Sequence, residues 1–373
     1  MGTRWARSIA QVPRHRNPAP APMPRCPLTI YAGGLFVCRV DQLAKSPGEF
    51  DWLSQLSQSL ARLPDMNDRS LLADRAANIW SSFQRNVEPL ARGATIVPAP
   101  EIRFDQIGGL VSPKDEILTY AYAQTSPDVY GRWGTFPPSA MLMIGRRGSG
   151  KSLLAEALAA RTETAFVRVD VPRMVLDVIH GVPKIGELIQ GWSAALDEMP
   201  PVTVFFDELE FSRAHDMGDR AGELPTGPIM DLLFELIDRS LAISDCLVIA
   251  STSHPDTLPE AFLSPGRFER VVEVNPLFPD DVIAALRIHA GEAESRAKRS
   301  IFGEFDWKGI VDNTREPSIG DWVRILHAVL RQKARLDAAG ENPEQVTEED
   351  FTREISRFRQ ANTRIRSDGG NYL

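Results

Sequence analysis

A segment of eight residues near the middle of the chain is rich in glycine and also carries positively charged and hydroxyl side chains. It has the sequence GRRGSGKS over residues 145–152, and it ends on Lys151 and Ser152. This fits the G-x-x-x-x-G-K-[ST] pattern, whose glycines let successive backbone N–H groups converge on a phosphate. A lysine at this place can reach the β- and γ-phosphates of a nucleotide, and the hydroxyl after it can bind Mg²⁺. The spacing therefore predicts a nucleotide site.

A second group of polar residues suits the same chemistry. The apolar run PVTVFF (201–206) ends on Asp207 and Glu208. The first acid can hold Mg²⁺ through water, and the second can polarise an attacking water molecule. Solvated acids are common at the ends of strands, but the phosphate loop upstream favours the functional interpretation. We predict that Ser152 and Asp207 hold Mg²⁺ and that Glu208 activates water.

The surrounding segments must place these residues together. Short apolar runs, rich in β-branched and aromatic residues, alternate with helical stretches from residue 101 to residue 275. This texture is typical of a parallel sheet covered by helices on both faces. The predicted fold is a three-layer α/β P-loop NTPase domain, with strands at 140–145, 165–170, 201–207, 246–251 and 270–275.

Two helical regions flank this domain. Residues 276–373 are expected to form a small all-α lid domain, in which Thr347 and Asp350 have the spacing of a capping box. Residues 50–100 show helical spacing and then a proline-containing stretch, 92–102, which is expected to be a linker. A glycine-rich turn can match the phosphate-loop pattern by chance, but the predicted strand before it and helix after it provide the context that the pattern requires.

The first 49 residues have a different composition. Six arginines and no acid precede Asp41, and prolines interrupt the segment. We expect a disordered leader, with two alternatives: a mitochondrial presequence, or upstream sequence before a true start at Met23. The expected location is cytoplasmic, or the mitochondrial matrix if the leader is a presequence.

Composition excludes several classes of function. The chain of 373 residues is 43% hydrophobic and 25% charged, as in soluble globular proteins. A formal net charge of −8 argues against non-specific binding of nucleic acid. The three cysteines are isolated and no HExxH motif occurs, so neither a disulfide framework nor a zinc protease is expected. The longest apolar run of the leader is too short to span a bilayer.

Taken in order, the motifs resemble those of the AAA proteins, the branch of the AAA+ ATPases that includes the proteasomal ATPases and valosin-containing protein. The segment FDQIGGL (104–110) is similar to the family's entry segment, residues 249–274 resemble its second region of homology, and SIGDW (318–322) resembles the turn before its last lid helix. The resemblance covers roughly residues 101–361. It implies that ATP and Mg²⁺ are bound by Ile107, Gly108, Gly145, Arg146, Arg147, Gly148, Ser149, Gly150, Lys151, Ser152, Asp207, His289 and Gly320.

The chain departs from the family pattern at several places. Arg146 and Arg147 replace the usual prolines, and Ser253 replaces the asparagine that orients the attacking water. Ser264 replaces the first of two arginines that a neighbouring subunit offers to the γ-phosphate, and only Arg267 remains. The resemblance implies catalytic roles for Glu208, Ser253 and Arg267, and loss of one arginine predicts slow turnover.

The resemblance also implies an assembly, because an arginine that completes a neighbour's site requires a ring. We expect a hexameric ring of this chain, or a ring shared with related chains. In such rings a pore loop grips the client, and Ile179 takes its usual aromatic position, with simple core packing as the alternative. The predicted function is a protein remodeller or unfoldase driven by ATP; the alternative is an ATP-gated regulatory or scaffold subunit.

Overall fold

The computed structural model describes residues 66–181, 184–210, 226–264, 266–268, 270–303, 305–314 and 317–367. The predicted leader, the first half of the helical region at 50–65 and Pro265 lie outside the described residues. All the structural statements below concern the described part of the chain.

A six-stranded sheet forms the centre of the α/β domain, in the order β1-β3-β4-β5-β2-β6. The five predicted strands are present, and they pair in parallel. Every residue of β4 and β5 is buried, as expected for strands that are covered on both faces. The strands are β1 (Ala94–Val97), β2 (Ala140–Ile144), β3 (Ala165–Asp170), β4 (Val202–Asp207), β5 (Cys246–Thr252) and β6 (Arg270–Glu273).

Strand β1 corrects the assignment of residues 92–102 to a linker. Residues 94–97 pair antiparallel with β3, in the register Ala94 to Val169. The strand is only four residues long, and Pro98, which has no N–H to donate, ends it. Its stability therefore depends on the neighbouring strand, which a local pattern does not reveal.

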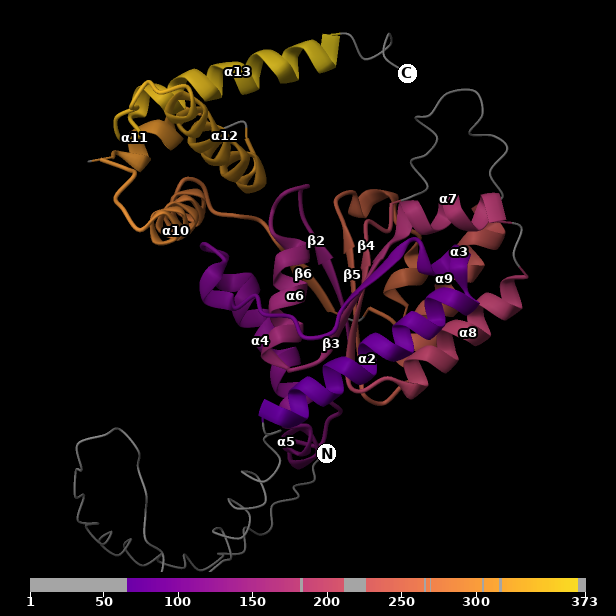
Figure 1. Cartoon of the computed structure of the whole chain (residues 1–373). Helices are drawn as coiled ribbons and strands as arrows, with labels where there is room; N and C mark the ends of the chain where they lie inside the picture. Colours follow the sequence, from indigo (N-terminus) through magenta and orange to yellow (C-terminus); the bar gives the residue numbers. More distant parts are fainter. Residues whose placement is uncertain are drawn as a thin grey trace, which may run out of the picture. The chain divides into compact units, whose positions relative to one another are not determined.

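Helices cover both faces of the sheet (Figure 1). On one face, the core contains residues of α2, α3, α7, α8 and α9; on the other, it contains residues of α4 and α6. Their bounds are α2 (Met66–Asn86), α3 (Glu88–Ala91), α4 (Val111–Thr125), α5 (Asp128–Arg132), α6 (Lys151–Arg161), α7 (Val171–Gly181), α8 (Ile185–Glu198) and α9 (Thr226–Leu241). Short 3₁₀ turns are η1 (Phe104–Gln106), η4 (Pro255–Thr257) and η5 (Glu260–Leu263).

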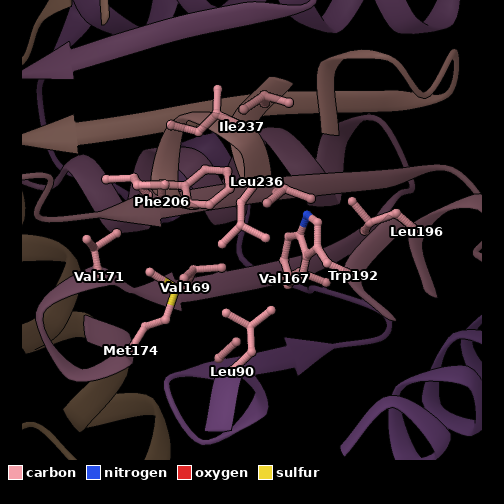
Figure 2. Packing of buried hydrophobic residues seen from close by; sticks show 14 of the residues in the cluster. Leu90, Val167, Val169, Val171, Met174, Trp192, Leu196, Phe206, Leu236 and Ile237 are labelled. Atoms are coloured by element: carbon pink, nitrogen blue, oxygen red, sulfur yellow. The ribbon is translucent and has the colours of Figure 1, made fainter. Parts of the chain in front are cut away.

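Helix α2 belongs to this core, although the sequence pattern places it in a helical region that flanks the domain. Its Trp80 and Phe83 are buried, and the Phe83 ring meets the ring of Trp192 of α8 edge to face, with 5.8 Å between centroids. Trp192 also packs against Phe206 of β4 (Figure 2). Helix α2 is therefore built into the face of the α/β domain.

The C-terminal helices have a core of their own, as predicted. It contains Trp322, Val329 and Phe351. The backbone N–H of Thr347 donates to Asp350 at 3.0 Å, in the expected capping arrangement. No described helix is long and apolar enough to cross a bilayer. The helices are α10 (Asp280–Ala297), α11 (Trp307–Asp312), α12 (Ile319–Ala338) and α13 (Glu348–Ser367).

Candidate functional site

The phosphate loop follows β2 and leads directly into α6. Gly148 and Gly150 have φ values of +75° and +108°, which residues other than glycine rarely adopt. A Cβ at Gly148 would lie 2.6 Å from the Ser318 hydroxyl oxygen, so no larger residue fits without movement. Helix α6 begins at Lys151, and its free N–H groups favour an anion at this end. The local structure is that of a phosphate cradle.

Lys151 is buried, and its ammonium group uses all three of its donors within the site. It donates to the carbonyl oxygens of Gly145 at 2.6 Å and Arg146 at 3.1 Å, and to the Ser253 hydroxyl at 3.2 Å. Burial lowers the pKa of Lys151, while Asp207 and nearby glutamates oppose this effect. A bound phosphate would give the buried ammonium group of Lys151 a negatively charged hydrogen-bond partner.

Asp207 ends β4 inside a dense polar network. Its Oδ2 accepts from the Ser152 hydroxyl at 3.2 Å and from Arg168 of β3 at 2.6 Å, and its Oδ1 accepts from the Ser251 hydroxyl at 2.5 Å. Ser152 and Asp207 are therefore close enough to share a hard cation. The described residues contain no cluster of three or more His, Cys, Asp or Glu residues that could hold a metal, so Mg²⁺ here would need phosphate and water ligands as well.

Glu208 is held in an unusual backbone conformation, with φ at +59°. Its backbone N–H donates to the Ser251 hydroxyl at 3.1 Å, which secures this turn. Its carboxylate meets Arg147 of the phosphate loop at 3.0 Å. Burial raises the pKa of Glu208, and Arg147 opposes the rise. A raised pKa suits a group that must accept a proton near neutral pH.

Glu210 is a further buried acid that the sequence did not single out. It accepts the backbone N–H of Ser253 at 3.0 Å, and the His254 ring lies 3.4 Å from the same oxygen. Although burial acts to raise it, the pKa of Glu210 is lowered overall, because Ser253 and Thr252 donate hydrogen bonds to the carboxylate. Glu210 therefore fixes the end of β5 that carries Ser253.

The described residues enclose a cavity of about 490 Å³ between the phosphate loop, the ends of β4 and β5, and helices α10 and α12. This volume lies within the roughly 300–1,000 Å³ of small-molecule sites. At one end Gly108 lies so close to α10 that an added Cβ would be 2.2 Å from the Ala285 nitrogen. The predicted residues that line the cavity are Ile107, Gly108, Arg147, Gly148, Ser149, Gly150, Lys151, Ser152, Asp207, Glu208, Ser253, His289 and Gly320.

Two buried polar atoms without partners, and a contact between the lid and the phosphate loop, are evidence that this cavity binds a nucleotide. The Ser149 hydroxyl and His289 Nδ1 are buried without a hydrogen-bond partner, and Glu292 is 3.7 Å from His289 Nδ1. The backbone N–H of Gly320 donates to the Gly148 carbonyl at 3.1 Å, which joins α12 to the phosphate loop. Unpaired polar atoms of this kind favour a polar ligand in the cavity.

Other predicted residues lie away from the cavity lining. Gly145 and Arg146 take part through their carbonyl groups, as acceptors for Lys151. Arg267 forms a two-point ion pair with Asp238 of α9, both contacts at 2.7 Å, and stacks over Phe234. Helix α7 continues to Gly181 through the segment expected to be a pore loop, and the side chain of Ile179 lies outside the described part.

Comparison with known proteins agrees with this geometry. Residues 141–276 match the model of the ATPase family associated with various cellular activities (AAA). This chain contains an AAA ATPase domain. It is similar to the proteasome-activating nucleotidase of Methanosphaerula palustris, with 28% identity over 78% of this chain and 68% of the relative.

Two other relatives are similar to more than half of this chain. The proteasome-activating nucleotidase of Methanosarcina mazei is 30% identical over 67% of this chain and 59% of its own length. Protein CdcH of Halobacterium salinarum is 29% identical over 58% of this chain and 29% of its own length. The chain thus spans less than a third of CdcH and up to about two thirds of the nucleotidases.

Proposed function

We propose that this protein hydrolyses ATP with Mg²⁺ and uses the released free energy to remodel or unfold other proteins. The proposal rests mainly on one arrangement: Lys151 and Ser152 of the phosphate loop face the paired acids Asp207 and Glu208 across one cavity. The name of two relatives, proteasome-activating nucleotidase, supports an activity directed at proteins.

In the proposed reaction, Glu208 accepts a proton from a water molecule while the water oxygen bonds to the γ-phosphorus. The bond between the γ-phosphorus and the bridging oxygen breaks, and the products are ADP and inorganic phosphate, to which the proton returns. Lys151 exchanges its contact with Ser253 for a phosphate oxygen, and Ser253 then becomes free to hold the water. Mg²⁺, bound by Ser152 and Asp207, supplies positive charge beside the phosphates.

We also propose that the protein works as a ring, formed by six copies of this chain or shared with related chains. Arg267 lies outside the lining of its own chain's cavity. In a ring it would approach the γ-phosphate of a neighbouring subunit, which is the role implied by its place in the AAA motif. Its pairing with Asp238 would then be exchanged for a phosphate when subunits assemble.

A second candidate function is an ATP-gated scaffold whose assembly depends on bound nucleotide and whose turnover is incidental. Two observations favour it: Ser253 has a short side chain for positioning water, and Arg147 engages the carboxylate of Glu208. A short side chain holds water less firmly, and an Arg147 that stayed on Glu208 would restrain the proton acceptor, while neither feature prevents nucleotide binding.

The test compares the purified full chain with Glu208→Gln. A chemically unfolded serum albumin serves as the model client. We expect albumin to stimulate ATP hydrolysis by the wild-type chain, and we expect Glu208→Gln to lower kcat at least ~10²-fold, as for loss of a general base. Glu198→Gln, at an exposed position at the end of α8, is the matched control and should retain activity. If the wild-type chain binds ATP but unfolded albumin does not stimulate its hydrolysis, the scaffold function is correct instead.

A further inference from the structure

Four described cations line the cavity: Arg147, Lys151, Arg168 and Arg324. Arg168 is paired with Asp207 at 2.6 Å, and Arg324 with Asp321 at 3.1 Å. Lys151 donates to carbonyl groups of its own loop. Arg147 differs from the other three, because its partner is Glu208, the group that the proposed function requires as the proton acceptor.

The position of Arg147 places its charge at one end of a bound triphosphate. Its backbone belongs to the phosphate loop, and its Nη2 lies 3.0 Å from the Glu208 carboxylate. Glu208 is adjacent to Asp207, whose carboxylate contacts the hydroxyl of Ser152, the proposed Mg²⁺ ligand. Ser152 and Asp207 would hold Mg²⁺ beside the terminal phosphates, so the guanidinium group of Arg147 would lie at the γ-phosphate end of the loop.

The ion pair between Arg147 and Glu208 is easy to exchange. The Arg147 side chain is 67% exposed and that of Glu208 is 35% exposed. Pairs this accessible to solvent contribute little to stability, because water screens both charges. A terminal phosphate carries more negative charge than a carboxylate and offers three oxygens to the guanidinium fork. ATP should therefore displace Glu208 as the partner of Arg147.

We infer that Arg147 is a further catalytic residue, which leaves Glu208 on ATP binding and pairs with the γ-phosphate oxygens from within the same chain. This inference rests on the proposed ATP hydrolysis. The exchange has two effects on that reaction. It places a positive charge where negative charge develops in the transition state, and it releases the Glu208 carboxylate to accept a proton from water. The structure thus provides in cis a charge that complements the Arg267 of a neighbour.

The opposite role would require Arg147 to stay on Glu208 when ATP binds. It would then restrain the proton acceptor, and its removal would accelerate hydrolysis. The two roles predict changes of opposite sign in kcat, so a single variant separates them. They also differ in binding, because only a contact with the γ-phosphate discriminates a triphosphate from ADP.

The experiment uses the full chain with Arg147→Ala, Arg147→Lys and the control Arg161→Ala. Arg161 is an exposed arginine in the last turn of the same helix that follows the loop. Calorimetry measures the affinity for ADP and for the slowly hydrolysed analogue ATPγS, and a coupled assay measures kcat with saturating Mg²⁺ and ATP. Circular dichroism checks that each variant is folded.

For Arg147→Ala we expect kcat to fall at least tenfold, with the roughly 10³–10⁵-fold contribution of a full arginine finger as the upper limit. Affinity for ATPγS should fall roughly tenfold, as for one charge-assisted hydrogen bond, while affinity for ADP should not change. Arg147→Lys should recover part of both losses, because it keeps the charge but not the fork. Arg161→Ala should match the wild type.

Unchanged or increased kcat in Arg147→Ala would overturn the inference, and so would an equal loss of affinity for ADP and ATPγS. If the wild-type chain itself hydrolyses no ATP, the proposed function fails. The comparison of ATPγS with ADP then still decides whether Arg147 contacts the γ-phosphate, so the two failures can be told apart.

Discussion

At the scale of single residues, Glu208 is subject to opposing influences. Burial is the largest and raises its pKa, and the neighbouring carboxylates Asp207 and Glu210 raise it further. Arg147 acts in the other direction, but the net effect is a pKa above the ordinary value. A carboxyl group in this condition is a better base at neutral pH than a solvated one.

This shift predicts the pH dependence of activity. A base must be deprotonated, so kcat/KM should fall as the pH drops through the pKa of Glu208 in the free enzyme. Because that pKa is raised, the fall should begin above the pH expected for an ordinary glutamate, whose pKa is about 4.3. The measurement is kcat/KM from acidic to neutral pH with excess Mg²⁺, which suppresses protonation of ATP. Glu198→Gln should leave the profile unchanged; a fall confined to the range of an ordinary glutamate would contradict the assignment.

The sequence revealed the residues of the site that belong to contiguous motifs, but not those that join the motifs. The phosphate loop and the acids after β4 have short, specific patterns. Arg168, Ser251 and Glu210 act through contacts between strands: Arg168 reaches Asp207 from β3, and Ser251 reaches it from β5. Such contacts depend on strand order and register. The sequence does show a charged residue, Arg168, within the apolar strand AFVRVD, but this pattern does not indicate which residue Arg168 contacts.

At the scale of elements, the order of the strands explains why the site forms where it does. Strand β5 lies between β4 and β2 in the sheet. The carboxyl end of β2 carries the phosphate loop, that of β4 carries Asp207, and that of β5 leads to Ser253. Parallel pairing brings these three ends to one edge, where ligands of open α/β sheets bind. The apolar runs predicted these strands, but their spatial order came only from the structure.

Helix α8 anchors one face of this sheet through Trp192. Trp192 is 1% exposed and packs between α2 and β4. It lies in the same buried cluster as Phe206 (Figure 2). Its indole N–H donates to the hydroxyl of Ser240 of α9 at 3.0 Å. Trp192→Ala would leave a cavity, and the Ser240 hydroxyl would lose the indole donor while it still donates to the Leu236 carbonyl. We expect it to lower the free energy of unfolding by about 3–5 kcal/mol, as for other buried aromatic residues.

Chemical denaturation of the full chain provides the measurement for Trp192→Ala. Trp133→Ala is the matched control, because this second tryptophan is 83% exposed and should change the free energy of unfolding by less than about 0.5 kcal/mol. Equal effects of the two substitutions would show that α8 does not stabilise the domain through Trp192.

At the scale of the whole molecule, the lid and the phosphate loop meet at the cavity. The Gly320 N–H at the start of α12 donates to the Gly148 carbonyl, and the Ser318–Asp321 capping box fixes this end of the helix. A nucleotide bound between them would contact both parts. This connection offers a physical route by which ATP and ADP could set different lid positions, and thereby different contacts between the subunits of the proposed ring.

The proposed ring makes a prediction that no single subunit can satisfy. In the proposed arrangement, Lys151 acts on ATP in its own chain, whereas Arg267 acts on ATP of a neighbour. Lys151→Ala should abolish ATP binding but keep a working Arg267, and Arg267→Ala should keep a binding site but lack the neighbour's arginine. Each variant alone should hydrolyse ATP at least tenfold more slowly than the wild type, since an arginine finger contributes about 10³–10⁵-fold.

Mixed before assembly, the two inactive variants should recover part of the wild-type turnover. An Arg267→Ala subunit beside a Lys151→Ala subunit has an intact phosphate loop and receives an intact arginine from its neighbour. This recovery distinguishes a role of Arg267 in a neighbour's site from a role in stabilising its own chain through Asp238. Loss of the pair with Asp238 would lower the stability of the variant subunit whichever subunit lies beside it. Co-purification through a tag on one variant verifies that mixed assemblies form. If such assemblies form and turnover stays at the level of the separate variants, Arg267 has no role at a neighbouring site.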